Sequence, residues 1–141
     1  MMRYLRQLVA IVLFGGALTI PAFGTIAYVQ KASASADASG TSLAVTVSST
    51  GAAALIVAMV KWEGANGSAP SVSDGTTSFT AATLKDHTNG DLHVQFFYLL
   101  SSNSGKTSIT TTWSLARVYR RVHVYEFSYT GTASLDVEKQ N

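Results

Sequence analysis

From residue 25 onward, the apolar side chains of this chain recur mostly with a period of two. Residues 41–48 show the pattern clearly, since Leu43, Val45 and Val47 fall on one side of an extended backbone. A period of two indicates β-strands, whereas an amphipathic helix would show a period of 3.6. The pattern therefore restricts the chain to strand-based folds and predicts no notable helix after residue 25.

Turn-forming residues divide this part of the chain into short strands. The predicted strands span residues 25–31, 41–48, 53–62, 76–84, 91–101, 106–113 and 119–129. Residues 31–40, 63–71 and 85–90 are predicted as loops and 72–75 as a turn, with Asn89-Gly90 favouring a tight hairpin. Residues 53–62 are nearly all apolar, which favours a central strand covered on both faces over a helix. This spacing favours an all-β, antiparallel β-sandwich or barrel.

The N-terminus has the three parts of a secretory signal. A basic start with Arg3 and Arg6 precedes an apolar run at 8–20, and small residues with Pro21 follow at 21–24. We expect residues 1–24 to be a signal peptide and 25–141 to be the mature domain. No charge separates Arg6 from Lys31, so an uncleaved membrane anchor is the alternative. Both alternatives predict an extracellular or cell-surface location.

Composition excludes several classes of function. Arg3 and Arg6 belong to the N-terminal segment, so the remainder carries as many basic as acidic residues. A neutral domain gives no case for nucleic-acid binding, which needs a basic surface. The chain has no cysteine, which excludes thiolate catalysis and cysteine-based zinc sites.

Three stretches carry a resemblance to a known group of proteins. They are Ala-Ala-Leu-Ile-Val-Ala-Met-Val-Lys-Trp-Glu at 53–63, Ser-Val-Ser-Asp-Gly at 71–75 and Val-His-Val-Tyr-Glu-Phe-Ser-Tyr at 122–129. With an I-x-x-V-Q start at 26–30, they resemble modules of large secreted bacterial proteins, namely jelly-roll sandwiches of the concanavalin-A-like lectin type. The resemblance covers about residues 25–137, and it implies fold and export more than a defined activity.

The resembling modules continue for several strands beyond a Leu-Asp turn like Leu135-Asp136, whereas this chain ends at Asn141. Two alternatives follow: an incomplete domain, or a subunit that a partner completes by strand exchange. In either case unpaired strand edges would invite pairing with another chain.

No catalytic or metal-binding constellation can be assembled from the sequence, so we expect no enzyme, no cofactor and no metal. His93 and His123 lie on separate predicted strands. Glu126 lies among apolar residues and is predicted to accept hydrogen bonds from turn amides or from Arg120 or Arg121. Glu63 is the one conceivable partner for Glu126 in a glycosidase-like pair.

Asp74, before Gly75, is predicted to form a turn through its own backbone, with calcium binding together with Asp86 or Asp91 as the alternative.

The predicted ligand-binding residues are aromatic and basic. Aromatic rings that cover the apolar faces of sugars suggest Trp113 and Tyr119, and Trp62, Tyr98, Tyr125 and Tyr129 are further candidates, with core packing as the alternative for each. Neighbouring Arg120 and Arg121 would attract acidic polysaccharide or a membrane surface, with a solvated strand edge as the alternative. We therefore expect a non-enzymatic extracellular binding or adhesion module, with polysaccharide or cell-surface glycan as its partner. The alternative is a structural subunit of a filament or surface coat that self-associates through strand edges. A membrane is expected as a partner only if residues 1–24 stay attached.

Overall fold

The computed structural model describes residues 24–64, 68–86 and 91–134. Within these ranges the chain forms strands and no helix, and all strand pairings are antiparallel. The predicted all-β, antiparallel class is therefore confirmed. The described ranges contain no helix that is long and apolar enough to cross a membrane. Residues 1–23 lie outside them, so the signal peptide or anchor stays a prediction.

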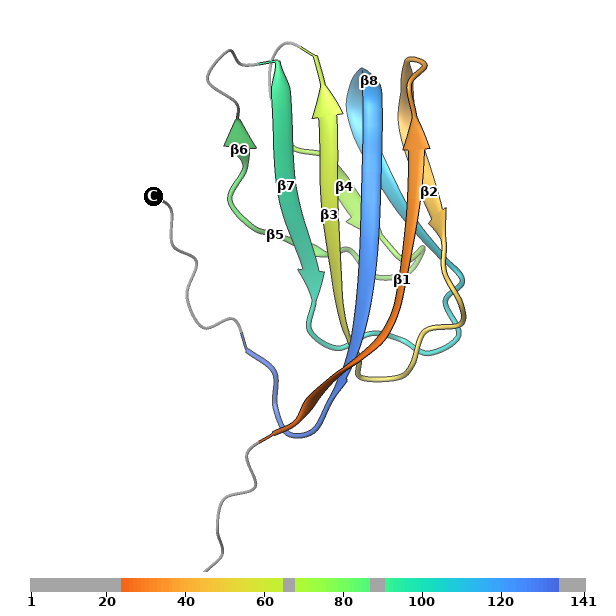
Figure 1. The fold of residues 1–141 in the computed structure, drawn as a ribbon, viewed down its shortest axis with the longest axis vertical. Coiled ribbons are helices and arrows are strands. Elements are labelled where there is room, and N and C mark those ends of the chain that lie inside the picture. The colour runs from red at the N-terminus through yellow and green to blue at the C-terminus, as the bar shows by residue number, and fades with distance from the viewer. Residues whose placement is uncertain (1–23, 65–67, 87–90, 135–141) are drawn as a thin grey trace, which may run out of the picture.

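One long strand organises the others (Figure 1). The strands in the described ranges are β1 (Ile26–Ala36), β2 (Gly40–Thr46), β3 (Leu55–Glu63), β4 (Ser71–Ser73), β5 (Thr80–Ala81), β6 (Lys85–Asp86), β7 (Leu92–Leu99) and β8 (Ser108–Tyr129). The C-terminal half of β8 lies between β1 and β3, and β3 pairs with β7, which also pairs with β5 and β6. The N-terminal half of β8 lies between β2 and β4.

The two halves of β8 bury alternate residues in opposite phase. Ile109 and Trp113 are buried in the first half, whereas Val122 and Val124 are buried in the second. The phase changes around Tyr119, whose φ of 47° places a non-glycine residue in the left-handed region. This local distortion lets one strand belong to two ladders that face each other.

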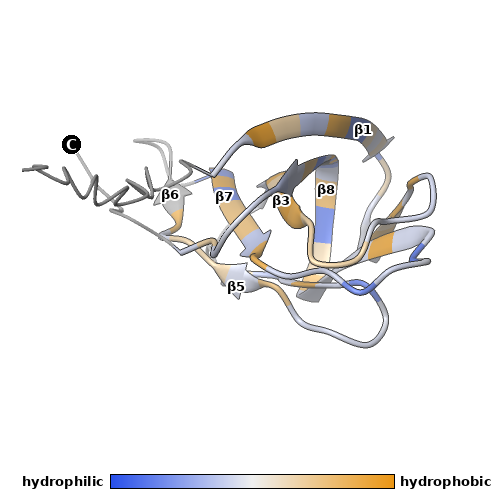
Figure 2. Ribbon diagram, turned by 90° about the horizontal axis from the view of Figure 1, so that it is seen from below, coloured by the Kyte–Doolittle hydropathy of each residue, from blue (hydrophilic) through white to orange (hydrophobic). Residues whose placement is uncertain are grey.

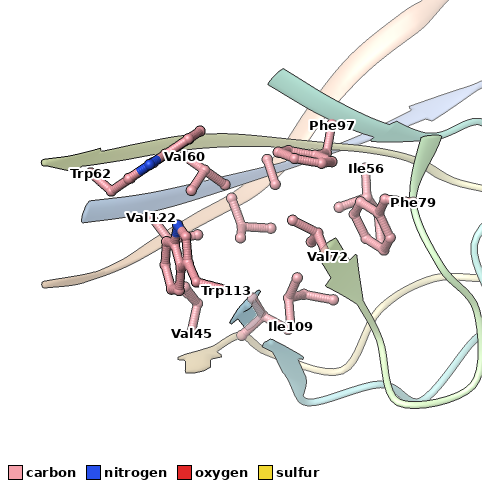
Figure 3. Packing of buried hydrophobic residues seen from close by; sticks show 13 residues of the cluster. Val45, Ile56, Val60, Trp62, Val72, Phe79, Phe97, Ile109, Trp113 and Val122 are labelled. Atoms are coloured by element: carbon pink, nitrogen blue, oxygen red, sulfur yellow. The ribbon is translucent and has the colours of Figure 1, made fainter. Parts of the chain in front are cut away.

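The core lies between these two ladders (Figure 3). Trp62 and Trp113 lie at one end of the cluster, and Phe97 and Phe79 lie at the other. Strand β3 alternates strictly, because Ile56, Ala58, Val60 and Trp62 are buried and their neighbours are half-buried. The expectation that 53–62 is covered on both faces is therefore wrong: one face packs in the core and the other stays partly open to solvent.

Further expectations about the strands are corrected. Residues 31–36 were predicted as a loop but continue β1. Small alanine and serine side chains are compatible with an edge strand as well as with a loop. Residues 106–113 and 119–129, predicted as separate strands, both contribute to β8. The short strands β4 and β6 also fall where a turn and a loop were predicted.

A buried carboxylate fixes the turn between β2 and β3. Glu126 is 2 % exposed, and its Oε1 accepts a hydrogen bond from the amide of Gly51 at 2.7 Å. Its Oε2 accepts from the side-chain amide of Gln30, which also bonds both backbone groups of Ser48. The expectation of turn amides is confirmed, whereas Arg120 and Arg121 do not supply these bonds. The carboxylate thereby joins β1, β8 and the turn.

We expect Glu126→Gln to lower the free energy of unfolding by about 2 kcal/mol, because a terminal NH2 would face either the Gly51 amide or the Gln30 amide. Urea unfolding followed by fluorescence would measure the loss. Glu63→Gln is the matched control, since Glu63 lies 3.9 Å from Lys61 in a half-exposed pair; its loss should stay below about 0.5 kcal/mol. Equal losses in both variants would contradict the structural role of Glu126.

Candidate functional site

Two of the four predicted ligand-binding residues lie in the interior. Trp113 is 2 % exposed and Arg120 is 5 % exposed. The Arg120 guanidinium lies 5.8 Å from the Trp113 ring centre, in cation–π geometry. Trp113 in turn meets Trp62 edge-on, and Trp62 stacks on His93. Trp113 and Arg120 therefore offer almost no surface to a ligand in this conformation.

Arg120 binds the segment that joins β1 to β2. Its guanidinium donates to the carbonyl oxygens of Ser42 and Ala38, the latter at 2.9 Å. Gly40 makes room for this contact, because a Cβ atom there would lie 2.7 Å from the nearest guanidinium nitrogen. These backbone acceptors offset part of the cost of burying the charge. This burial could have been predicted from the sequence, because Arg120 lies two residues before the buried Val122 and therefore on the same face of the strand.

The other two predicted residues are at the surface. Tyr119 is 48 % exposed at the distortion of β8. Arg121 points away from the core and donates to Asp37 at 2.5 Å. Tyr119 and Arg121 thus remain available to a ligand, and their binding role stays a prediction. The structure does not bring the four predicted residues together on one surface.

The carboxylates do not form a glycosidase pair. Glu126 lies opposite Ile56, near the start of β3. Glu63 ends that strand, about 20 Å away at roughly 3.3 Å per residue. Hydrolysis of a glycosidic bond needs carboxyl groups about 5 to 9.5 Å apart. Glu126 and Glu63 therefore cannot act together on one glycosidic bond.

The histidines are also separate. His93 is buried on the core side of β7, and one of its ring nitrogens lies 2.8 Å from the Gly64 carbonyl oxygen. His123 lies on the opposite side of the sheet, in register with Met59. His87 lies outside the described ranges. Among the described residues, no three His, Asp or Glu side chains group closely enough to hold a metal ion.

Asp74 forms the turn that follows β4. Its Oδ1 accepts hydrogen bonds from the amides of Thr76 and Thr77, at 2.8 and 2.6 Å, and from the Thr76 hydroxyl. Burial by itself would raise the pKa of Asp74, but these bonds and the charge of Lys106 outweigh it, so the pKa is lowered. The predicted turn-forming role of Asp74 is confirmed.

The most distinctive surface is the side of strands β1, β8, β3 and β7 that points away from the core, here called the outer face. Neighbouring strands place their side chains in rows across it. One row runs Tyr98, Val57, Tyr125, Lys31, and the next runs Phe96, Met59, His123, Ser33. The outer face is thus apolar and aromatic over β3 and β7 and becomes polar toward β1.

A shallow groove lies on the outer face where it becomes polar. Its volume is about 260 Å³, and it is lined by Lys31, Ala32, Ser33, His123 and Tyr125. Small side chains on β1 leave the space, and the ring of Tyr125 borders it. The groove brings together an aromatic ring, an imidazole, a hydroxyl and an ammonium group. Such a set can stack on a ring and hydrogen-bond to polar groups at its edge.

Sequence reasoning found only half of this groove. The alternation at 122–129 placed His123, Tyr125 and Phe127 on one face, which the structure confirms. Ser33 was missed because its segment was predicted as a loop, and Lys31 was missed because it stood at the boundary between the predicted strand 25–31 and that loop. The Lys-Ala-Ser-Ala-Ser pattern from residue 31 has a period of two in polarity, and that signal could have revealed the strand.

A second hollow, of about 390 Å³, lies where β1 begins and β8 ends. Ile26, Leu55, Leu100 and Tyr129 contribute its large side chains, and small residues at 24–25 and within 130–134 supply the rest. The Tyr129 hydroxyl already donates to the carbonyl oxygen of Leu100 at 2.5 Å. This hollow therefore offers fewer directed polar groups than the groove beside Tyr125.

Comparison with models of known protein families, with curated proteins and with solved structures finds no match to this chain. The resemblance to lectin-type jelly-roll modules gains no support from these comparisons and stays a prediction. Any function for the outer face must therefore be argued from its own geometry.

We expect Asp74→Asn to destabilise the protein at pH 7 by about 1 to 2 kcal/mol, because the lost charge accepted several hydrogen bonds. The folded-state pKa is lowered, so this contribution is present above the unfolded value of about 3.8 and is lost as the pH falls through the folded value. Urea unfolding of both proteins at pH 7 and at about pH 2.5 would measure it. The difference should shrink at the lower pH; a difference independent of pH would contradict the role of the charge.

Proposed function

We propose that this protein is a non-enzymatic binding module that holds a carbohydrate on its outer face. The observation that carries the proposal is the groove beside Tyr125, where an aromatic ring meets Lys31, Ser33 and His123. Sugars present apolar ring faces and polar edges, and this groove offers a partner for each. No catalytic role is proposed for any residue.

The size of the groove suits a small part of a longer glycan. Its volume of about 260 Å³ lies just below the roughly 300 Å³ at which pockets for drug-sized ligands begin. One sugar ring could occupy the groove while neighbouring rings lie along the outer face. Tyr98 and Phe96 would lie under such an extension, two strands away from β8. Lys31 and Arg121 would favour an acidic polysaccharide.

The proposal extends to fold and location. The core enclosed between two ladders is compatible with a jelly-roll-like β-sandwich of the lectin type. A secretory signal or anchor at residues 1–24 would place the module outside the cell or on its surface, where polysaccharides and cell-surface glycans occur. Adhesion through a bound glycan would follow from that location.

A second candidate is a structural subunit of a filament or surface coat. The observation that favours it is the long edge strand β1, which pairs only with β8 among the described strands. An exposed edge can take up a strand from another chain.

Binding of the full chain to immobilised neutral and acidic polysaccharides tests the first proposal. We expect Tyr125→Ala to weaken binding about tenfold, because stacking contributes about 1 kcal/mol and the groove also loses its wall. Tyr98→Ala is the matched control, since Tyr98 lies in the same row but outside the groove; it should weaken binding less.

Two outcomes would contradict this site. Loss of binding in Tyr119→Ala with full binding in Tyr125→Ala would place the ligand at the distortion of β8 instead. Absence of binding to every polysaccharide would reject the carbohydrate proposal. Equal weakening of binding to acidic and neutral glycans in Lys31→Ala would exclude charge as the source of preference.

A further inference from the structure

Strand β1 leaves a long edge of the sheet open. It spans 11 residues and stands at the end of the strand order β1-β8-β3-β7-β5. Figure 2 shows it as an arch along the border of the fold. Proteins usually protect such an edge with proline, inward-pointing charges or bulges. The single irregularity lies between Tyr28 and Gln30, and the pairing with β8 is regular from Gln30 to Ala36.

Backbone groups along this regular part face the open edge at every second residue. At the start of β1, the amide of Thr130 donates to the carbonyl oxygen of Thr25, so residue 130 faces β1. In an antiparallel ladder the direction of these groups alternates from residue to residue. Counting back along β8 in twos, Val124 and Val122 also face β1, so the backbone groups of their partners Ala32 and Ala34 point to β8. The backbone groups of Ser33 and Ser35 therefore point outward.

The sequence of the edge is complementary to itself. Residues 31–37 read Lys-Ala-Ser-Ala-Ser-Ala-Asp, with Ala34 at the centre. If two copies pair antiparallel about Ala34, alanine faces alanine and serine faces serine. Lys31 of each copy then faces Asp37 of the other. A shift by two residues in either direction would separate both charge pairs.

We propose that a second copy of this chain docks on the β1 edge, antiparallel and centred on Ala34. The outward backbone groups of Ser33 and Ser35 form the new ladder, in which Ser33 of each copy faces Ser35 of the other, and two Lys31–Asp37 ion pairs lie at its ends. Asp37 keeps 68 % of its side chain exposed while it binds Arg121, so it retains oxygen surface for a lysine of the second copy.

This pairing has consequences for assembly. A two-fold contact uses the same surface on both copies, so it closes a dimer and does not propagate into a filament. The two outer faces become one continuous surface. The groove of each copy is lined by Lys31 and Ser33 on the joined strand, so the two grooves lie on either side of the new ladder. Neither glycan binding nor dimerisation depends on the other.

Charge reversal tests the contact and its register. In Lys31→Glu, each introduced carboxylate would face Asp37 of the second copy, and in Asp37→Lys each introduced ammonium group would face Lys31. Sedimentation of the full chain should show a concentration-dependent dimer that each variant alone weakens at least tenfold. An equimolar mixture of the two variants should restore it, because every facing pair is then oppositely charged.

Two further variants complete the experiment. Ser35→Pro removes an outward amide that β8 does not use, so it should keep the fold, checked by circular dichroism, and abolish the dimer. Lys61→Glu makes the same charge change on central strand β3 and should leave the dimer intact.

A wild-type protein that stays monomeric up to about 200 μM would overturn the proposal, since strand-edge contacts smaller than a standard interface still reach micromolar affinity. A mixture that fails to restore the dimer would overturn it as well. A dimer unaffected in both single variants would place the contact elsewhere. Each of these readings is independent of glycan binding, which the Tyr125 variant reports.

Discussion

Strand β8 serves two ladders at once, and the other strands are arranged around it. Its first half pairs with β2 and β4, and its second half pairs with β1 and β3. The change of burial phase around Tyr119 turns the inner side chains of both halves toward one core. A residue with a φ of 47° at that point carries a conformational cost. That cost is met by the packing of Trp113 and Val122 on either side.

Buried polar side chains hold the turns to this framework. Glu126 and Gln30 fix the turn after β2, Arg120 binds the segment between β1 and β2, and Asp74 shapes the turn after β4. Each of them bonds mainly to backbone groups. A chain without cysteine cannot cross-link its loops by disulfides, and buried side-chain to backbone bonds supply part of that rigidity. The motif residues Gln30, Asp74 and Glu126 are thus structural.

The inner faces of the long strands could be predicted from period-two alternation, because burial on one side of a strand demands it. Residues 31–36 could not be assigned in the same way, since alanine and serine fit an edge strand and a loop alike. Trp113 and Arg120 were predicted as ligand-binding residues, with core packing as the alternative for Trp113, and both are buried. A charged residue such as Arg120 is usually exposed. Here its side chain is buried, because it lies on the same face of the strand as Val122 and because Gly40 has no side chain to exclude the guanidinium. The groove was half predicted, through His123 and Tyr125.

Antiparallel strands with one apolar side each follow from the sequence alone, because the side-chain period is a property of the extended backbone. The self-complementary Lys-Ala-Ser-Ala-Ser-Ala-Asp segment is likewise visible in the sequence. Which strands are neighbours depends on the tertiary structure, and so does the meeting of Lys31 and Ser33 with His123 and Tyr125. The physical reason is that strand pairing is non-local: residues about ninety positions apart come together only once β1 has docked on β8.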